Sequence, residues 1–166
     1  MSKIYVDEIA GIASPSTVAI PGHVIQTVGE LESNSGTTNL FNSSSTSYVA
    51  TGHYFDITPT ASTSKIAVFC SGTMYGNNSG AWYDMTIQRT VGATTTDLRG
   101  SADKLGGLYT GGGDEACQVS VCVLDSPATT SSVRYEVYVK TKDGTASVFW
   151  GVNGSRPQFV LQEIAG

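Results

Sequence analysis

The sequence predicts an all-β protein, an antiparallel β-sandwich or jelly roll preceded by an extended N-terminal arm. Short hydrophobic stretches recur along the chain, and several alternate apolar and polar residues with the period of a half-buried strand. Clusters of glycine, proline, serine and asparagine separate them, and no segment has apolar residues at helical spacing over three turns. Only 14% of the residues are charged, against about 25% in a typical soluble domain, and the abundant threonine, serine and glycine suit strands and turns.

Residues 1–22 are predicted to form a separate docking arm. Residues 3–9 alternate as a strand would, and glycine and proline interrupt residues 11–22. A short strand without a hairpin partner cannot satisfy its own backbone groups, so it needs an edge from the rest of the chain, from another subunit or from another protein. The alternative is that this segment is the first strand of the main sheet. The candidate anchors of the arm are the apolar side chains Ile4, Val6 and Ile9.

Residues 23–166 are predicted to form one domain of about eight to ten strands. The expected strands cover residues 24–28, 48–57, 65–70, 82–90, 117–124, 133–140, 146–150 and 159–164. In the segment 82–90, Tyr83, Met85 and Ile87 share one face while Trp82 and Asp84 share the other. In the segment 133–140, the inward side chains are expected to be Val133, Tyr135, Val137 and Val139.

Three connections complete the prediction. Residues 32–47 are expected to be a polar loop, and residues 101–114 a flexible glycine-rich stretch. Residues 142–145 are expected to form a hairpin turn in which Gly144 supplies a positive φ angle.

The residues do not favour an enzyme. Two histidines, His23 and His53, cannot form a three-histidine zinc site, and neither lies beside a nucleophile motif, so both are expected at the surface or at an interface. Asp114 and Glu115 follow three glycines but lack the alternating oxygen ligands of a calcium loop, which favours a solvated loop. Glycoside hydrolysis needs two carboxylates placed across a groove, and nothing in the sequence favours any particular pair of acidic residues for that role. We therefore expect no catalytic residue, no metal and no cofactor.

The three cysteines, Cys70, Cys117 and Cys122, are odd in number and have no metal-site spacing. Cys117 and Cys122 are five residues apart, so on a regular strand they point to opposite faces and cannot form a disulfide with each other. All three are expected to be small buried hydrophobic residues.

Charge and hydropathy limit the partners. The net charge is −5 and the nine lysines and arginines are scattered, which argues against binding to nucleic acid. No apolar run approaches the roughly 18 residues of a membrane span, so no membrane insertion is expected. Two acidic residues near the start argue against a signal peptide and predict a protein made in a cytoplasm.

Three aromatic residues lie in or beside glycine-rich loops and are candidate ligand contacts, because flat aromatic rings stack on sugars. They are Tyr75, Trp82 and Tyr109. For Trp82 the favoured alternative is a place in the core or at a subunit interface.

Six segments, in order along nearly the whole chain, carry a family resemblance: residues 2–9, 20–26, 48–59, 64–68, 125–129 and 161–166. Together they resemble small virion proteins and fibre modules of tailed bacteriophages, especially those of cyanobacterial and marine hosts. The resemblance implies homotrimers of β-sandwich domains around a three-fold axis, with the N-terminal segment attached to the particle. Tail fibres usually carry long shafts or repeats, and this chain of 166 residues has none.

We therefore expect a virion structural protein on the particle exterior, made in the bacterial host cytoplasm. A trimeric capsid decoration (cement) protein or short fibre protein, docked by its arm onto capsid or tail proteins, fits best. The alternative is a receptor-binding fibre module that contacts a host-surface glycan. A cellular trimer similar to C1q or TNF is disfavoured because no secretion signal is present.

Overall fold

A computed structural model describes residues 22–31, 41–152, 155 and 157–166 of the chain. The prediction of an all-β protein is confirmed, since all regular structure in this part is strand. The strands are β1 (Val24–Leu31), β2 (Phe41–Ser43), β3 (Val49–Ile57), β4 (Lys65–Gly76), β5 (Trp82–Val91), β6 (Thr94–Asp97), β7 (Gly106–Tyr109), β8 (Glu115–Asp125), β9 (Val133–Thr141), β10 (Val148–Trp150) and β11 (Gln158–Ile164). The arm anchors Ile4, Val6 and Ile9 lie outside the described residues.

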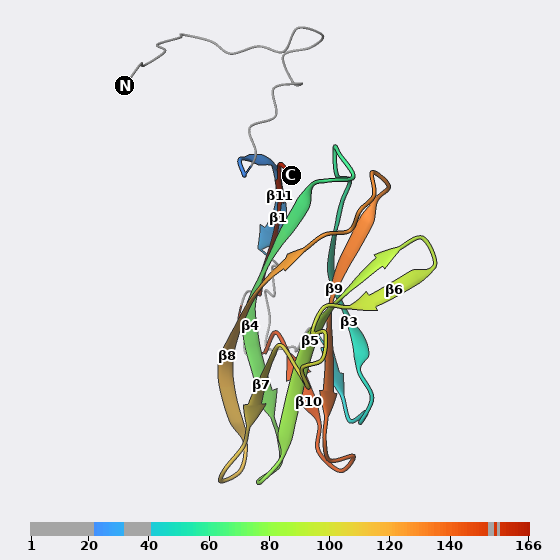
Figure 1. The fold of residues 1–166 in the computed structure, drawn as a ribbon. Helices are drawn as coiled ribbons and strands as arrows, with labels where there is room; N and C mark the ends of the chain where they lie inside the picture. The colour runs from blue at the N-terminus through green and yellow to red at the C-terminus, as the bar shows by residue number, and fades with distance from the viewer. Residues whose placement is uncertain (1–21, 32–40, 153–154, 156) are drawn as a thin grey trace, which may run out of the picture.

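The strands form two antiparallel sheets that face each other (Figure 1). In the first, here called the β4 sheet, the order is β1-β11-β4-β10-β2, and β8 also pairs with β4. In the second, here called the β5 sheet, the order is β3-β9-β5-β6, and β7 also pairs with β5. One hydrophobic core takes side chains from both sheets, which gives a sandwich-like arrangement.

The period-2 alternation places the expected side chains in this core. Tyr83, Met85 and Ile87 of β5 are 0% exposed, and so are the four inward residues of β9, so both predictions are confirmed. Trp150 of β10 is also fully buried, and its ring lies over Gly72 of β4. A Cβ atom at Gly72 would lie 2.6 Å from that ring, so only glycine lets it sit against the strand.

Several predicted connections are wrong. Strand β2 lies in the segment expected to be a polar loop, and β7 lies in the expected flexible stretch. The segment 142–145 does not close a hairpin, because β9 belongs to the β5 sheet and β10 to the β4 sheet. Gly144 does not adopt a positive φ there. The Asp143 side chain instead organises the turn, accepting hydrogen bonds from the Thr145 amide at 3.0 Å and hydroxyl at 2.9 Å.

Only one of the three cysteines is buried. Cys70 lies in the core, and burial raises the pKa of its thiol, as expected for a small hydrophobic residue. Cys117 and Cys122 are exposed, so the prediction of their burial is wrong. Both pair with β4 residues, Met74 and Phe69 respectively, and the unbroken register places them on opposite faces of the sheet as expected. Cys117 is exposed because it lies toward the end of the core-facing row of β8, and Cys122 is exposed because it lies on the outer face.

The two histidines differ from each other. His23 is exposed, but His53 is 3% exposed, which contradicts the prediction of a surface or interface position. Its ring lies among Phe55, Trp150 and Phe159, and its Nδ1 accepts a hydrogen bond from Trp150 Nε1 at 3.2 Å. Because this environment disfavours a charged ring, burial lowers the pKa of His53 to about 4.

The buried carboxylate of Glu163 is hydrogen-bonded on both oxygen atoms within the fold. Glu163 of β11 is 0% exposed and accepts hydrogen bonds from Gln26 Nε2 at 2.6 Å and from the Thr60 amide and hydroxyl, each at 2.7 Å. Burial, the largest influence, acts to raise the pKa of Glu163, but hydrogen bonds from neighbours including Gln26 and Thr60 outweigh it and leave the pKa below its usual range. This network ties β1, β11 and the segment after β3 together.

The described chain begins beside its own end. The Gly22 amide donates to the Ala165 carbonyl at 2.8 Å, and the Ala165 amide donates to the His23 carbonyl at 2.9 Å. Gly22, the first described residue, therefore lies next to the C-terminus (Figure 1). Within the described residues there is no helix with the length and hydropathy to cross a membrane.

Candidate functional site

Two of the three predicted aromatic residues meet on the outer face of the β5 sheet. Trp82 of β5 is the cross-strand partner of Tyr109 of β7, and their ring centroids lie 4.6 Å apart. Trp82 is 46% exposed and Tyr109 is 47% exposed. A place for Trp82 in the core is therefore excluded, because the alternation of β5 sends Tyr83 inward and Trp82 outward. The other alternative, a subunit interface, stays a prediction.

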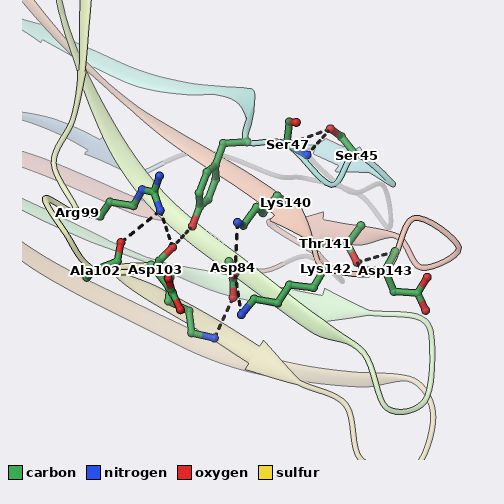
Figure 2. A network of polar contacts seen from close by, with 12 residues as sticks. Ser45, Ser47, Asp84, Arg99, Ala102, Asp103, Lys140, Thr141, Lys142 and Asp143 are labelled. Atoms are coloured by element: carbon green, nitrogen blue, oxygen red, sulfur yellow. Dashed lines mark hydrogen bonds and ion pairs between the residues drawn. The ribbon is translucent and has the colours of Figure 1, made fainter.

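A buried carboxylate lies beside this pair. Asp84 follows Trp82 by two residues, so it shares the same outer face, yet its side chain is 0% exposed. Three lysines cover it: Lys104 Nζ lies 2.9 Å from Asp84 Oδ1, while Lys140 Nζ and Lys142 Nζ lie 3.8 and 3.9 Å from Oδ2. Figure 2 shows Lys140 and Lys142 reaching Asp84 from neighbouring positions of the chain.

The lysines also contact aromatic rings. Lys104 Nζ lies 4.6 Å from the centroid of a Trp82 ring, and Lys142 Nζ lies 5.8 Å from it. Lys140 Nζ lies 4.6 Å from the Tyr48 ring. These distances fit cation–π contacts, which hold the ammonium groups over the sheet. We call Trp82, Tyr109, Asp84 and the three lysines the lysine–aromatic cluster.

Tyr48 and Arg99 close one side of the cluster. The Tyr48 hydroxyl donates to the Asp103 carbonyl at 2.9 Å, and the Arg99 guanidinium donates to the same carbonyl at 3.0 Å. Arg99 also forms an ion pair with Asp97 at 2.9 Å (Figure 2 shows Arg99 beside Asp103). Burial, with a contribution from the Asp84 charge, raises the pKa of Tyr48. The segment 98–105 is thereby held down over the sheet, which brings Lys104 to Asp84.

The third predicted aromatic residue lies elsewhere. Tyr75 belongs to β4 in the other sheet, where its ring lies 5.2 Å from that of Phe149 and its hydroxyl donates to Asp114 at 2.7 Å. Glu115 accepts hydrogen bonds from the amides of Gly111 and Gly112 at 3.0 and 3.2 Å. The two acidic residues after the glycines therefore organise their own loop. Among the described residues, no three His, Cys, Asp or Glu side chains form a group that could hold a metal ion.

The outer faces of the two sheets differ in charge. The register places six charged strand residues on the outer face of the β5 sheet: Asp56, Asp84, Asp97, Arg134, Glu136 and Lys140. On β4, β8 and β11, all of whose residues are described, the only charged residue that faces outward is Lys65, at the end of β4.

Apolar side chains occupy part of this second face, here called the charge-poor face. Phe69 is 41% exposed and Leu124 is 58% exposed. An open hollow of about 310 Å³ lies between β4, β8 and β11, and its lining includes Phe69, Cys122 and Val160. Charged residues are depleted and apolar ones gathered, as in the centre of a protein–protein interface.

Sequence reasoning identified Trp82 and Tyr109 but not the charged half of the cluster. The alternation of β5 predicted that Asp84 shares the face of Trp82, and that of β9 left Lys140 facing outward. Only the register of the sheet shows that the two are direct cross-strand partners. No local pattern could have brought Lys104 to the same carboxylate, since it depends on how the segment 98–105 folds back.

No protein-family model matches the chain, and a comparison with curated proteins finds no match either. The resemblance to phage virion proteins therefore stays a prediction from the sequence.

Proposed function

We propose that the chain is a noncatalytic structural protein of the exterior of a bacteriophage particle, either a homotrimeric capsid decoration (cement) protein or a short fibre protein. The observation that carries the self-assembly part of this proposal is the charge-poor face of the β4 sheet. The virion location rests on the ordered sequence segments that resemble phage proteins.

The strand order supports a jelly roll. The series β1-β11-β4-β8 lies opposite β3-β9-β5-β7, which is an eight-stranded double sheet of the kind that two Greek keys produce. The position of Gly22 beside Ala165 supports a docking arm that leaves the domain at one end.

The occupant that we propose for the charge-poor face is a second copy of the chain. Burying a charged side chain without a partner costs several kcal/mol of desolvation energy. A face with few charges can be buried against another copy without that cost. Leu124 protrudes from this face and the hollow beside Phe69 and Cys122 recedes into it. Each copy thus offers both a projection and a recess, which suits a heterologous contact that closes around a three-fold axis.

The oligomeric state tests this contact. Light scattering coupled to size-exclusion chromatography should give the mass of a trimer for the unmodified chain and that of a monomer for Leu124→Glu. Tyr54→Glu is the matched control, because Tyr54 is a similarly exposed hydrophobic residue (40%) on the other sheet and contacts Arg134, which can receive the new charge. A monomeric unmodified chain, or a Leu124→Glu variant that stays trimeric, would contradict the proposal.

The two exposed cysteines provide an internal comparison. Cys122 lines the hollow on the charge-poor face, whereas Cys117 lies on the same strand with its side chain directed to the opposite face. In the trimer a thiol reagent should modify Cys117 readily and Cys122 at least about tenfold more slowly, with the difference lost in Leu124→Glu. Equal rates in the trimer would place the interface elsewhere.

The particle location needs a separate test. Labelling of intact virions with antibody against this chain should mark the particle surface, and removal of residues 1–22 should release the protein from particles while leaving it trimeric. If the truncated protein remains fully bound, the docking role of the arm is wrong.

A further inference from the structure

We propose that the lysine–aromatic cluster binds a saccharide that carries a carboxylate group. This binding function goes beyond the structural role proposed above and uses the opposite sheet face, so it does not depend on the trimer contact. Trp82 and Tyr109 would stack on the sugar ring, and Lys142, with Lys140 behind it, would contact its acidic group.

The aromatic pair has the exposure of a ligand platform. Trp82 and Tyr109 are each nearly half exposed, whereas Asp84, the next residue on the same face of β5, is fully buried. The two rings are tilted by 40° and so form an angled surface rather than one flat stack. The C–H face of a pyranose packs well on such rings, while its hydroxyl groups remain available to the polar surroundings.

The charges beside the platform are unbalanced. Three ammonium groups approach one carboxylate, and only Lys104 is within hydrogen-bonding distance of it, at 2.9 Å. Asp84 Oδ2 is buried and has no hydrogen bond among the described residues, so Lys140 and Lys142 at 3.8 and 3.9 Å retain their donors. A ligand carboxylate can use those donors and offset the surplus positive charge.

Other acidic groups near the cluster are already engaged. Asp97 is paired with Arg99 at 2.9 Å, and Asp143, next to Lys142 in sequence, accepts two hydrogen bonds from Thr145 in its own turn. The main-chain carbonyl of Asp103 accepts the Tyr48 hydroxyl, and the charge of the Asp103 side chain contributes to raising the pKa of Tyr48. Lys142, whose side chain is 45% exposed, is the ammonium group that solvent and a ligand reach most easily.

The geometry favours a saccharide over nucleic acid. A stacking pair with lysines could also accept bases and phosphates. However, the chain has a net charge of −5 and the cluster offers only a few cations, so a polyanion with one charge per nucleotide would meet repulsion outside the cluster. Two ammonium groups lie near the Trp82 ring, and Lys104 is already paired with Asp84 at 2.9 Å. Lys142 therefore remains for the single acidic group of a sugar that stacks on Trp82.

Intrinsic fluorescence can measure binding directly. The chain has two tryptophans, and Trp150 is fully buried, so quenching or a spectral shift on titration reports mainly on Trp82. The panel contains galacturonate, mannuronate and a sialylated trisaccharide, each with a single carboxylate. Maltotriose is the neutral counterpart and oligothymidylate the nucleic-acid counterpart. At least one acidic saccharide should bind, more weakly at high salt, and the neutral one should bind at least about tenfold more weakly.

Variants locate the site. Lys142→Gln should weaken binding by about three- to tenfold, and Trp82→Ala, followed by calorimetry because the fluorophore is lost, should weaken it by at least about tenfold. Tyr54→Ala is the matched control: Arg134 lies 3.6 Å from the Tyr54 ring, but Asp56 already neutralises it at 2.9 Å.

Several other results would overturn the proposal. If no acidic saccharide binds at concentrations up to about 10 mM, the cluster does not have this function. If the neutral saccharide binds as tightly as the acidic ones, the lysines have no role in binding. If oligothymidylate binds more tightly than the saccharides, and Trp82→Ala and Lys142→Gln weaken that binding, the site is one for nucleic acid. Loss of binding in Tyr54→Ala, or its retention in both Trp82→Ala and Lys142→Gln, moves the site away from the cluster.

Discussion

Acidification should destabilise this protein through one buried imidazole. His53 is 3% exposed, and its Nδ1 accepts a hydrogen bond from Trp150 Nε1, so the neutral ring has its proton on Nε2. Protonation of His53 Nδ1 would place its N–H opposite the Trp150 Nε1–H, so that two donors face each other, and would leave a positive charge among aromatic rings. Among the described residues nothing accepts a hydrogen bond from Nε2, so no neighbour compensates that charge.

The magnitude is set by the two pKa values. The pKa of His53 is about 4 in the folded protein, against 6.5 in the unfolded chain. Because the unfolded chain binds the proton more readily, the contribution to stability is complete above about pH 6.5 and is lost as the pH falls toward 4. Between pH 7 and pH 5 this linkage removes about 2 kcal/mol of unfolding free energy, while most carboxyl groups titrate at lower pH.

Urea unfolding, followed by tryptophan fluorescence at one protein concentration, measures the change. The unmodified chain should lose about 2 kcal/mol between pH 7 and pH 5. His53→Asn keeps an acceptor for Trp150 and removes the titrating group, so it should be less stable at pH 7 but nearly insensitive to pH in this range. His23→Asn, at the exposed histidine, is the control. If the unmodified chain and His53→Asn lose the same free energy, the assignment to His53 is wrong.

Three further predictions concern packing and charge. Gly72→Ala should lower the unfolding free energy by about 1–3 kcal/mol, because a Cβ atom would meet the Trp150 ring. Gly112→Ala, where a Cβ atom would meet open space, should change it little, and equal effects of the two variants in denaturant titrations would refute the packing account. Glu163→Gln should cost about 1–3 kcal/mol, since an amide cannot accept on both sides as the buried carboxylate does, and an unchanged melting temperature would contradict this. Asp84→Asn should cost about 1–2 kcal/mol, because it leaves three partly exposed ammonium groups without a counter-charge. Part of the loss should return at high salt, and a loss that salt does not reduce would argue against electrostatics.

Local period and composition were enough to predict the all-β fold and the inward faces of the long strands. In β5 and β9 the alternation of apolar and polar residues is itself the physical cause of burial, because successive side chains point to opposite faces. The short strands β2, β6 and β7 have no such pattern. β6 and β7 are strands because the longer β5 pairs with both of them, and β2 pairs with the equally short β10.

The sequence by itself determined which residues alternate, that Cys117 and Cys122 cannot bond to each other, and that Trp82 and Tyr109 were the aromatic residues to follow. Only the tertiary structure decided what covers each face. It buried His53 between the sheets, left both of those cysteines exposed, and brought Lys104 to Asp84. Burial on one side of a strand depends on segments distant in sequence that fold over it, and the local pattern carries no information about where those segments return.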